Sequence, residues 1–127
     1  MRRGFLLFVL CVGVLFYGWD QGITKGGVGR YIEKHPTVYG GERLLYVLGG
    51  FHEVWNEDKK ALEMYDRIRR VYPESRWSDE AQYGVASSYE RMKNRPKALE
   101  EYEKYIKEFP KGRFHASVSK NISLLRY

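Results

Sequence analysis

The chain has 127 residues, 43% of them hydrophobic and 30% charged, a composition typical of one folded globular domain and not of a disordered tail. Its formal net charge of +6 comes from 22 Lys and Arg against 16 Asp and Glu, and the two signs are interspersed through most of the sequence. This mixing is typical of solvated helix faces and argues against nucleic-acid binding, which would require a basic stripe beside exposed aromatic residues. Because Cys11 is the only cysteine, an intrachain disulfide is excluded.

The N-terminal segment is predicted to be a signal-anchor or a signal peptide. Arg2 and Arg3 precede an uncharged, apolar run at residues 4–19, as in export signals. As a helix this run would span about 24 Å, less than the roughly 30 Å of a hydrocarbon core, and this favours a cleaved signal. No pair of small residues marks a cleavage site, however, and Tyr17 and Trp19 suit a membrane interface, which favours a retained anchor. Either way, residues 4–19 meet the membrane and the rest of the chain faces its outer, periplasmic or extracytoplasmic side.

A glycine-rich stretch follows at residues 20–30 and is predicted to be a flexible linker. Its Gly26-Gly27-Val28-Gly29 run lacks the Gly-Lys-Ser/Thr ending of a phosphate-binding loop, and no strand precedes it. The predicted organisation is therefore a membrane or signal segment at 1–19, a linker at 20–30 and a helical repeat domain at 31–127.

The strongest signal is an internal repeat. Pro36, Pro73 and Pro110 are spaced 37 residues apart, and the segment Ala61–Tyr65 lines up with Ala98–Tyr102 at the same offset. A fixed period of this size indicates stacked supersecondary units.

Each unit is predicted to be a pair of antiparallel helices, so the fold class is all-α. Apolar residues fall at helical spacing in 43–55 and 80–92, and again in the second helices, which end before Pro73 and Pro110. Asp58 is predicted to cap one of these second helices, and Pro96 suits the first turn of the other.

Half-repeats flank the two full units. Residues 28–35 look like the tail of a second helix, and residues 113–126 like a first helix without a mate. The basic residues of that end, Lys111, Arg113, Lys120 and Arg126, either form a solvated face or meet an anionic partner.

The spacing of Ala86, Tyr89, Ala98, Tyr102 and Pro110 resembles the tetratricopeptide repeat. The first unit shows the same pattern at Gly49, Ala61, Tyr65 and Pro73, with His52 at the place of a tyrosine.

The link Tyr72-Pro73-Glu74-Ser75 is similar to the bacterial envelope branch of these repeats, which includes the outer-membrane assembly lipoprotein and the Tol-Pal-associated coordinator of cell-envelope division. The chain departs from that branch because it lacks the lipid-bearing cysteine, the long array and the coiled coil. The resemblance therefore implies a helical-repeat fold and a scaffold role, not membership of either assembly.

A partner-binding groove is expected along the first helices of the units, because helical repeats present concave surfaces to peptides. Repeat geometry places five candidate residues there: Tyr46, Gly50, Tyr83, Ser87 and Glu90. The unmated last helix offers an apolar face that includes Phe114, Val118 and Ile122, which either meets a partner or a second copy, or closes the array as a cap.

No pattern of residues predicts catalysis, a metal site or a cofactor. His35, His52 and His115 lack the spacing of metal ligands, and no nucleophile has a neighbouring base. The leading hypothesis is a non-catalytic protein-binding module at the cell envelope or membrane. The alternative is an accessory subunit that stays bound in a membrane complex, with Gly4, Gly13 and Gly18 permitting close helix packing.

Overall fold

The computed structural model describes the backbone of residues 2–127 and the side chains of residues 8–23 and 25–127. Met1 and the side chains of Arg2 and Arg3, which form the predicted cationic head, lie outside the described residues. The described chain forms two compact units, one that ends at His35 and one that covers Pro36–Tyr127. Every regular element between residues 2 and 127 is helical, as the all-α prediction requires.

The first unit contains three helical elements: α1 (Arg2–Trp19), the π-helical turn η1 (Asp20–Thr24) and α2 (Gly27–Lys34). The stretch at 20–30 that was expected to be a linker coincides with η1 and the start of α2, so most of its backbone is helical. A Cβ atom at Gly27 would clash with the backbone oxygen of Gln21, so this turn depends on a glycine. No helix in the described part of the chain combines the length and the apolar character that crossing a membrane requires.

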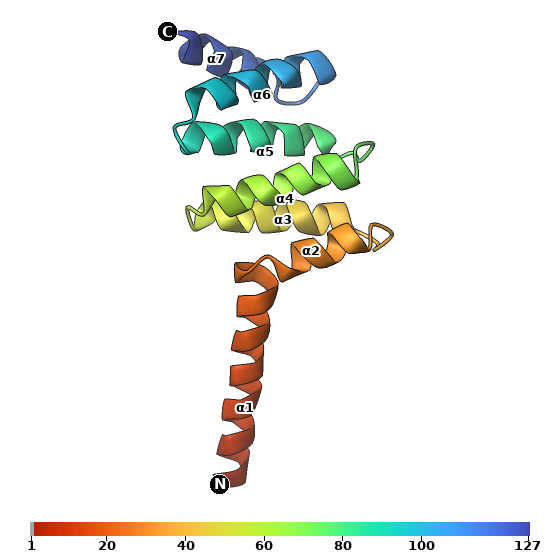
Figure 1. Ribbon diagram of the computed structural model, residues 1–127, viewed down its shortest axis with the longest axis vertical. Coiled ribbons are helices and arrows are strands. Elements are labelled where there is room, and N and C mark those ends of the chain that lie inside the picture. Colours follow the sequence, from red (N-terminus) through yellow and green to blue (C-terminus); the bar gives the residue numbers. More distant parts are fainter. Residues whose placement is uncertain (1) are drawn as a thin grey trace. The chain divides into compact units, whose positions relative to one another are not determined.

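The second unit is a row of helices in which each packs against the next (Figure 1). They are α3 (Gly41–Val54), α4 (Asp58–Val71), α5 (Ser78–Arg91), α6 (Arg95–Glu108) and α7 (His115–Arg126). The first residues of α3, α5 and α7 are spaced by the 37-residue period. The predicted architecture is therefore present in this unit: two helix pairs, α3/α4 and α5/α6, followed by one single helix.

The prolines of the repeat set the helix ends. The helices α4 and α6 stop two residues before Pro73 and Pro110, and the intervening residues Tyr72 and Phe109 have nearly equal φ angles of −128° and −126°. A residue before proline is sterically excluded from the α region, which explains this shared geometry.

The starts of the second helices are only partly as expected. Pro96 lies in the first turn of α6, and Asn94 caps that helix by accepting a hydrogen bond from the Lys97 backbone nitrogen at 3.3 Å. The prediction that Asp58 caps α4 is wrong. Asp58 is the first helical residue, and its carboxylate instead accepts a hydrogen bond from Arg91 of α5 at 2.6 Å.

A tyrosine held between two glycines joins the first three helices of this unit. Tyr65 of α4 is 4% exposed, and its ring lies against Gly49 of α3 and Gly84 of α5. A Cβ atom at Gly49 would lie 2.5 Å from Tyr65 Cε1, and one at Gly84 would lie 2.6 Å from Tyr65 Cδ2. Both distances are too short for any side chain, so the ring fills the space that two missing Cβ atoms leave.

Tyr102 occupies the equivalent position one repeat later. It is fully buried, and Ala86 and Asn121 stand at the positions equivalent to Gly49 and Gly84. The Asn121 side-chain amide donates a hydrogen bond to the Tyr102 hydroxyl oxygen at 3.0 Å. The second repeat thus anchors α7 with a polar contact where the first anchors α5 with ring packing.

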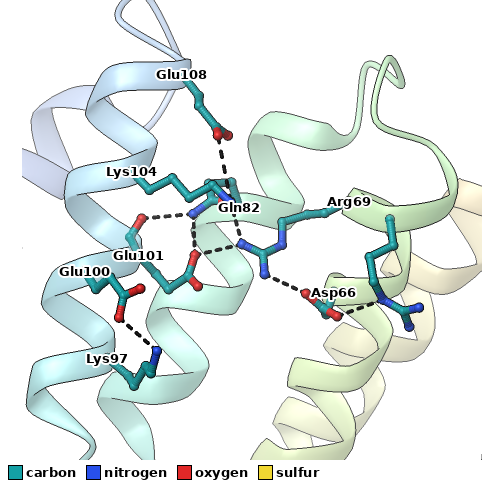
Figure 2. Close-up of polar contacts among 9 residues, drawn as sticks. Asp66, Arg69, Gln82, Lys97, Glu100, Glu101, Lys104 and Glu108 are labelled. Carbon is teal, nitrogen blue, oxygen red and sulfur yellow. Dashed lines mark hydrogen bonds and ion pairs between the residues drawn. The ribbon is translucent and has the colours of Figure 1, made fainter.

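A polar network joins α4, α5 and α6 to one another (Figure 2). The guanidinium of Arg69 donates to Gln82 Oε1 at 2.8 Å and to Glu101 Oε2 at 2.7 Å, and also to Asp66 Oδ1 at 2.5 Å. Gln82, which is 1% exposed, donates to the backbone and the carboxylate of Glu101, both at 2.9 Å. Burial alone would lower the pKa of Arg69, but the bonds from Asp66 and Glu101 outweigh burial and raise that pKa.

The neighbouring glycines Gly49 and Gly50 provide a matched test of the tyrosine packing. We expect Gly49→Ala to lower the free energy of unfolding by about 2 kcal/mol, because the new methyl group would overlap the Tyr65 ring. Gly50→Ala meets no atom within 4 Å and should raise it by about 0.5 kcal/mol through helix propensity. Urea unfolding of the full-length chain, followed by circular dichroism, measures both. Equal effects of the two substitutions would contradict the packing described.

The ion pairs in Figure 2 allow a second comparison. Arg69→Ala should cost about 2 kcal/mol of unfolding free energy, because it leaves largely buried acceptors of Glu101 and Gln82 without their donor. Lys97→Ala removes only an exposed pair with Glu100 and should leave that energy nearly unchanged. The same urea titration measures both variants. If Arg69→Ala lowers the free energy of unfolding no more than Lys97→Ala does, the network adds no stability.

Candidate functional site

A groove of about 310 Å³ lies over α3 and α5 in the second unit. The helix α3 contributes one wall and α5 the other, while the α4 residue Tyr65 and Phe114, at the start of α7, complete it. The lining residues are Tyr46, Glu53, Tyr65, Glu80, Tyr83, Gly84, Ser87, Arg91 and Phe114. They come from α3, α4, α5 and the start of α7, so the groove exists only because the repeat stacks these elements.

Three aromatic lining residues, Tyr46, Tyr83 and Phe114, belong to ring pairs that repeat with the 37-residue period; the fourth ring, Trp77, lies outside the lining. Tyr46 packs against Trp77 with ring centroids 4.8 Å apart, and Tyr83 packs against Phe114 with centroids 4.3 Å apart. The second pair is nearly parallel, with an interplanar angle of 12°. Each ring pair joins an interior residue of one first helix to the residue that precedes the next first helix, so the aromatic surface continues along the row.

An arginine covers the outer ring of each pair. The guanidinium carbon of Arg76 lies 5.3 Å from the ring centroid of Trp77, and that of Arg113 lies 5.0 Å from the centroid of Phe114. These distances suit cation–π attraction. The sequence signal for this feature is the pair Arg76-Trp77 and Arg113-Phe114 at the repeat spacing, which sequence reasoning missed.

Two carboxylates stand at equivalent positions and meet the two core tyrosines. The Tyr102 hydroxyl donates to Glu90 Oε2 at 2.6 Å. One repeat earlier, Glu53 stands beside the hydroxyl of Tyr65. Burial is the main cause that raises the pKa of both tyrosines, and the adjacent carboxylates raise it further. Both tyrosines therefore remain neutral hydrogen-bond donors that hold these carboxylates in place.

Arg91 is the guanidinium that lines the groove, and it is already paired. Its Nη2 donates to Glu53 Oε1 at 2.8 Å, and its Nε donates to Asp58 Oδ1 at 2.6 Å. Burial would lower the pKa of Arg91, but the bonds from Asp58 and Glu53 raise it. This residue links α5 to both helices of the preceding pair and leaves little positive charge for a ligand.

Glu80 is the carboxylate with spare capacity. Its Oε2 atom is buried without a hydrogen-bond partner, and its Oε1 lies 3.4 Å from Arg113 Nη2. The side chain as a whole is 14% exposed. Among the described residues, the Tyr72 hydroxyl is the other buried side-chain group in this state, and it does not line the groove.

The structure brings four of the eight residues predicted to bind a partner to this groove. Tyr46, Tyr83, Ser87 and Phe114 all line it. Gly50 and Glu90 lie on α3 and α5, outside the set of lining residues. The lining residues that sequence reasoning missed are three charged ones, Glu53, Glu80 and Arg91, together with Tyr65 and Gly84.

The remaining two predicted residues lie elsewhere. Val118 has no exposed surface, and Ile122 packs against the same buried cluster, so α7 directs this face into the domain and not toward a partner. That cluster also contains Ala86, Ala98, Tyr102 and Tyr105. The helix needs no external mate for these residues, because α6 provides one.

The histidines have local packing roles where the structure shows a contact. His52 is 1% exposed, and its Nδ1 lies 2.7 Å from Glu57 Oε2. Lys60 and then His52 lower the pKa of the Glu57 carboxylate through their hydrogen bonds. In the described part of the chain, no group of three or more His, Cys, Asp and Glu side chains could hold a metal ion.

Comparison with known proteins identifies one segment. The family model of the tetratricopeptide repeat matches residues 80–112, which cover most of α5, all of α6 and the following turn. No curated protein and no solved structure matches the chain. The match supports a tetratricopeptide-repeat protein, and the groove residues Glu80, Tyr83, Ser87 and Arg91 lie within the matched segment.

Proposed function

We propose that this chain is a non-catalytic protein-binding module whose groove over α3 and α5 receives a segment of a partner protein. The observation that carries the proposal is the aromatic surface of the groove, built from ring pairs that recur with the repeat. Repeats of the matched family are protein-interaction modules, and stacked helical repeats use such surfaces to bind extended or helical peptides.

The small volume and the exposed aromatic rings of the groove favour a peptide over a small metabolite. Its volume of about 310 Å³ is at the lower end of the range for small-molecule pockets. Aromatic rings that remain partly exposed supply contact area with few rotatable bonds, which is why they are enriched at protein interfaces.

Ser87 is the best position at which to test the groove. It lies on the α5 wall; its hydroxyl donates to the backbone oxygen of Gly84 at 3.1 Å and accepts from Arg91 Nη1 at 3.3 Å, both within its own helix. Tyr83→Ala would be a poor probe, because Tyr83 stacks on Phe114 and packs against the buried cluster. Its loss would lower stability as well as remove a groove wall.

We expect Ser87→Trp to abolish partner binding without unfolding the domain, because the indole would occupy the groove. The matched control is Ser119→Trp on α7, where an exposed serine also donates to a backbone oxygen of its own helix. The measurement is a mild-detergent pull-down of tagged full-length chain from native membranes, quantified by mass spectrometry. The same partners in the same amounts with Ser87→Trp as with wild type would contradict the proposal.

We also propose that residues 4–19 attach the chain to a membrane, with the second unit on the outer side. The described part of α1 supports this, because its large apolar side chains are exposed: Phe8, Val9, Leu10, Val14, Leu15, Phe16, Tyr17 and Trp19. So much exposed apolar surface on one helix requires a lipid or protein cover. An envelope location is further supported by the resemblance of the Tyr72–Ser75 link to envelope proteins.

A second candidate function is an accessory subunit held permanently in a membrane complex. Gly13 and Gly18 of α1 have no other atom within 4 Å of a Cβ built on them, which leaves room for another helix to approach closely. In that case membrane proteins would be recovered in stoichiometric amounts and at high salt, even with Ser87→Trp. Loosely held partners that this substitution removes would instead favour the binding module.

Attachment to the membrane can be tested with a single charge. We expect Leu10→Lys to shift the chain from the alkaline-washed membrane fraction to the supernatant, because a lysine in an apolar helix opposes insertion. Tyr39→Lys, at a fully exposed site of the second unit, is the control and should not change the distribution. The mass of the mature N-terminus then separates a retained anchor from a cleaved signal. Wild-type chain that keeps residues 1–19 but remains in the supernatant would refute the attachment.

A further inference from the structure

We propose that the groove selects partner segments by a basic side chain, a lysine or arginine whose cation pairs with Glu80. This inference rests on the proposed function and specifies what the groove recognises. The observation behind it is the buried, unpartnered Oε2 atom of Glu80 on the groove wall. A buried acceptor on a charged group is normally satisfied, and leaving one open has a cost in stability.

Glu80 is not needed to complete the helix on which it lies. Both Asp79 and Glu80 stand in the first turn of α5, where a carboxylate favours the positive end of the helix. Asp79 is already used: its carboxylate accepts from the Tyr105 hydroxyl, and from the Arg113 backbone nitrogen at 3.0 Å. Within the structure, Asp79 fixes the start of α7, and the Oε2 atom of Glu80 remains without a hydrogen-bond partner.

The surroundings of Glu80 suit a long cationic side chain. Tyr83, one helical turn further along α5, and its stacked partner Phe114 also line the groove. Aromatic faces attract cations, and the methylene stem of a lysine or arginine packs against such rings. The cation paired with Glu80 inside the protein is Arg113, whose side chain is 68% exposed and reaches only Oε1.

The charges of the groove oppose an acidic ligand. Arg91, its lining guanidinium, is already paired with Glu53 and Asp58. A partner carboxylate would therefore meet the negative charge of Glu80, while Arg91 and Glu53 already balance each other across the groove. Like charges in a partly desolvated site are repulsive, so the groove discriminates by sign as well as by shape.

Pools of capped heptapeptides, random except for a fixed central residue, test this selectivity on the immobilised full-length chain in detergent. The three pools carry lysine, norleucine or glutamate at the centre. Norleucine retains the aliphatic stem of lysine without its charge. We expect the lysine pool to be retained about tenfold more than the norleucine pool, which corresponds to one charge-assisted hydrogen bond, and the glutamate pool least.

Substitution of the carboxylate locates the effect. Glu80→Gln should reduce the lysine-to-norleucine ratio to about one, whereas Glu100→Gln, at an exposed carboxylate of α6, should leave it unchanged. Arg113→Ala should maintain or increase the ratio, because it removes the internal competitor for Glu80. Circular dichroism verifies that each variant is folded.

The outcomes separate this inference from the proposed function. Equal retention of lysine and norleucine pools, or a ratio that Glu80→Gln does not change, would overturn the selectivity for a basic side chain. If Ser87→Trp still abolished that retention, the groove would remain a protein-binding site without this selectivity. If the Ser87→Trp variant retained every pool as the wild-type chain does, the result would count against both proposals. If Arg113→Ala removed the preference for the lysine pool over the norleucine pool, Arg113 would form the site, and the assignment to Glu80 would be overturned.

Discussion

The placement of Tyr65 between Gly49 and Gly84 is the contact on which the second unit depends. It sets how closely α3 and α5 approach the helix between them, and it forms the floor of the groove that those two helices wall. Its hydroxyl stands beside Glu53, whose carboxylate accepts a hydrogen bond from Arg91. One ring therefore connects the packing of three helices to the electrostatics of the surface, so the core and the proposed binding site cannot vary independently.

Some groove positions carry the same kind of residue in both repeats, and others differ between them. Positions inside the stack are small or aromatic in both repeats, because helix spacing fixes the volume available there. Positions on the rim differ between repeats: Arg91 of α5 stands where α3 has Val54, and Glu80 stands where α3 has Arg43. Geometry is thus set by the repeated positions, whereas the charge that a partner meets comes both from a repeated position, Glu53, and from the unrepeated Glu80 and Arg91.

Sequence reasoning predicts the helices well for the same reason. The prolines and the apolar period report local constraints, so the helix pairs, the helix ends just before Tyr72 and Phe109, and the single α7 follow from them. The roles of individual polar residues depend on neighbours distant in sequence. Asp58 was expected to cap its own helix and instead binds Arg91, and the unpartnered oxygen of Glu80 is visible only in the folded structure. The apolar face of α7 that includes Val118 was left open between a partner surface and a cap, because one helix considered alone does not reveal that α6 covers it.

The pairing of Arg91 with Glu53 and Asp58 has a mechanical consequence. Together with Tyr65, it ties α5 to the preceding helix pair on the groove side, while the Arg69 network ties α5 to α4 and α6 on the other. A row of helices joined only to neighbours bends like a spring, and ties on both sides limit bending in both directions. A peptide lying across α3 and α5 adds a further brace on one side only. An occupied groove should therefore set the curvature of the row, and any second protein that touches the opposite side would sense that curvature.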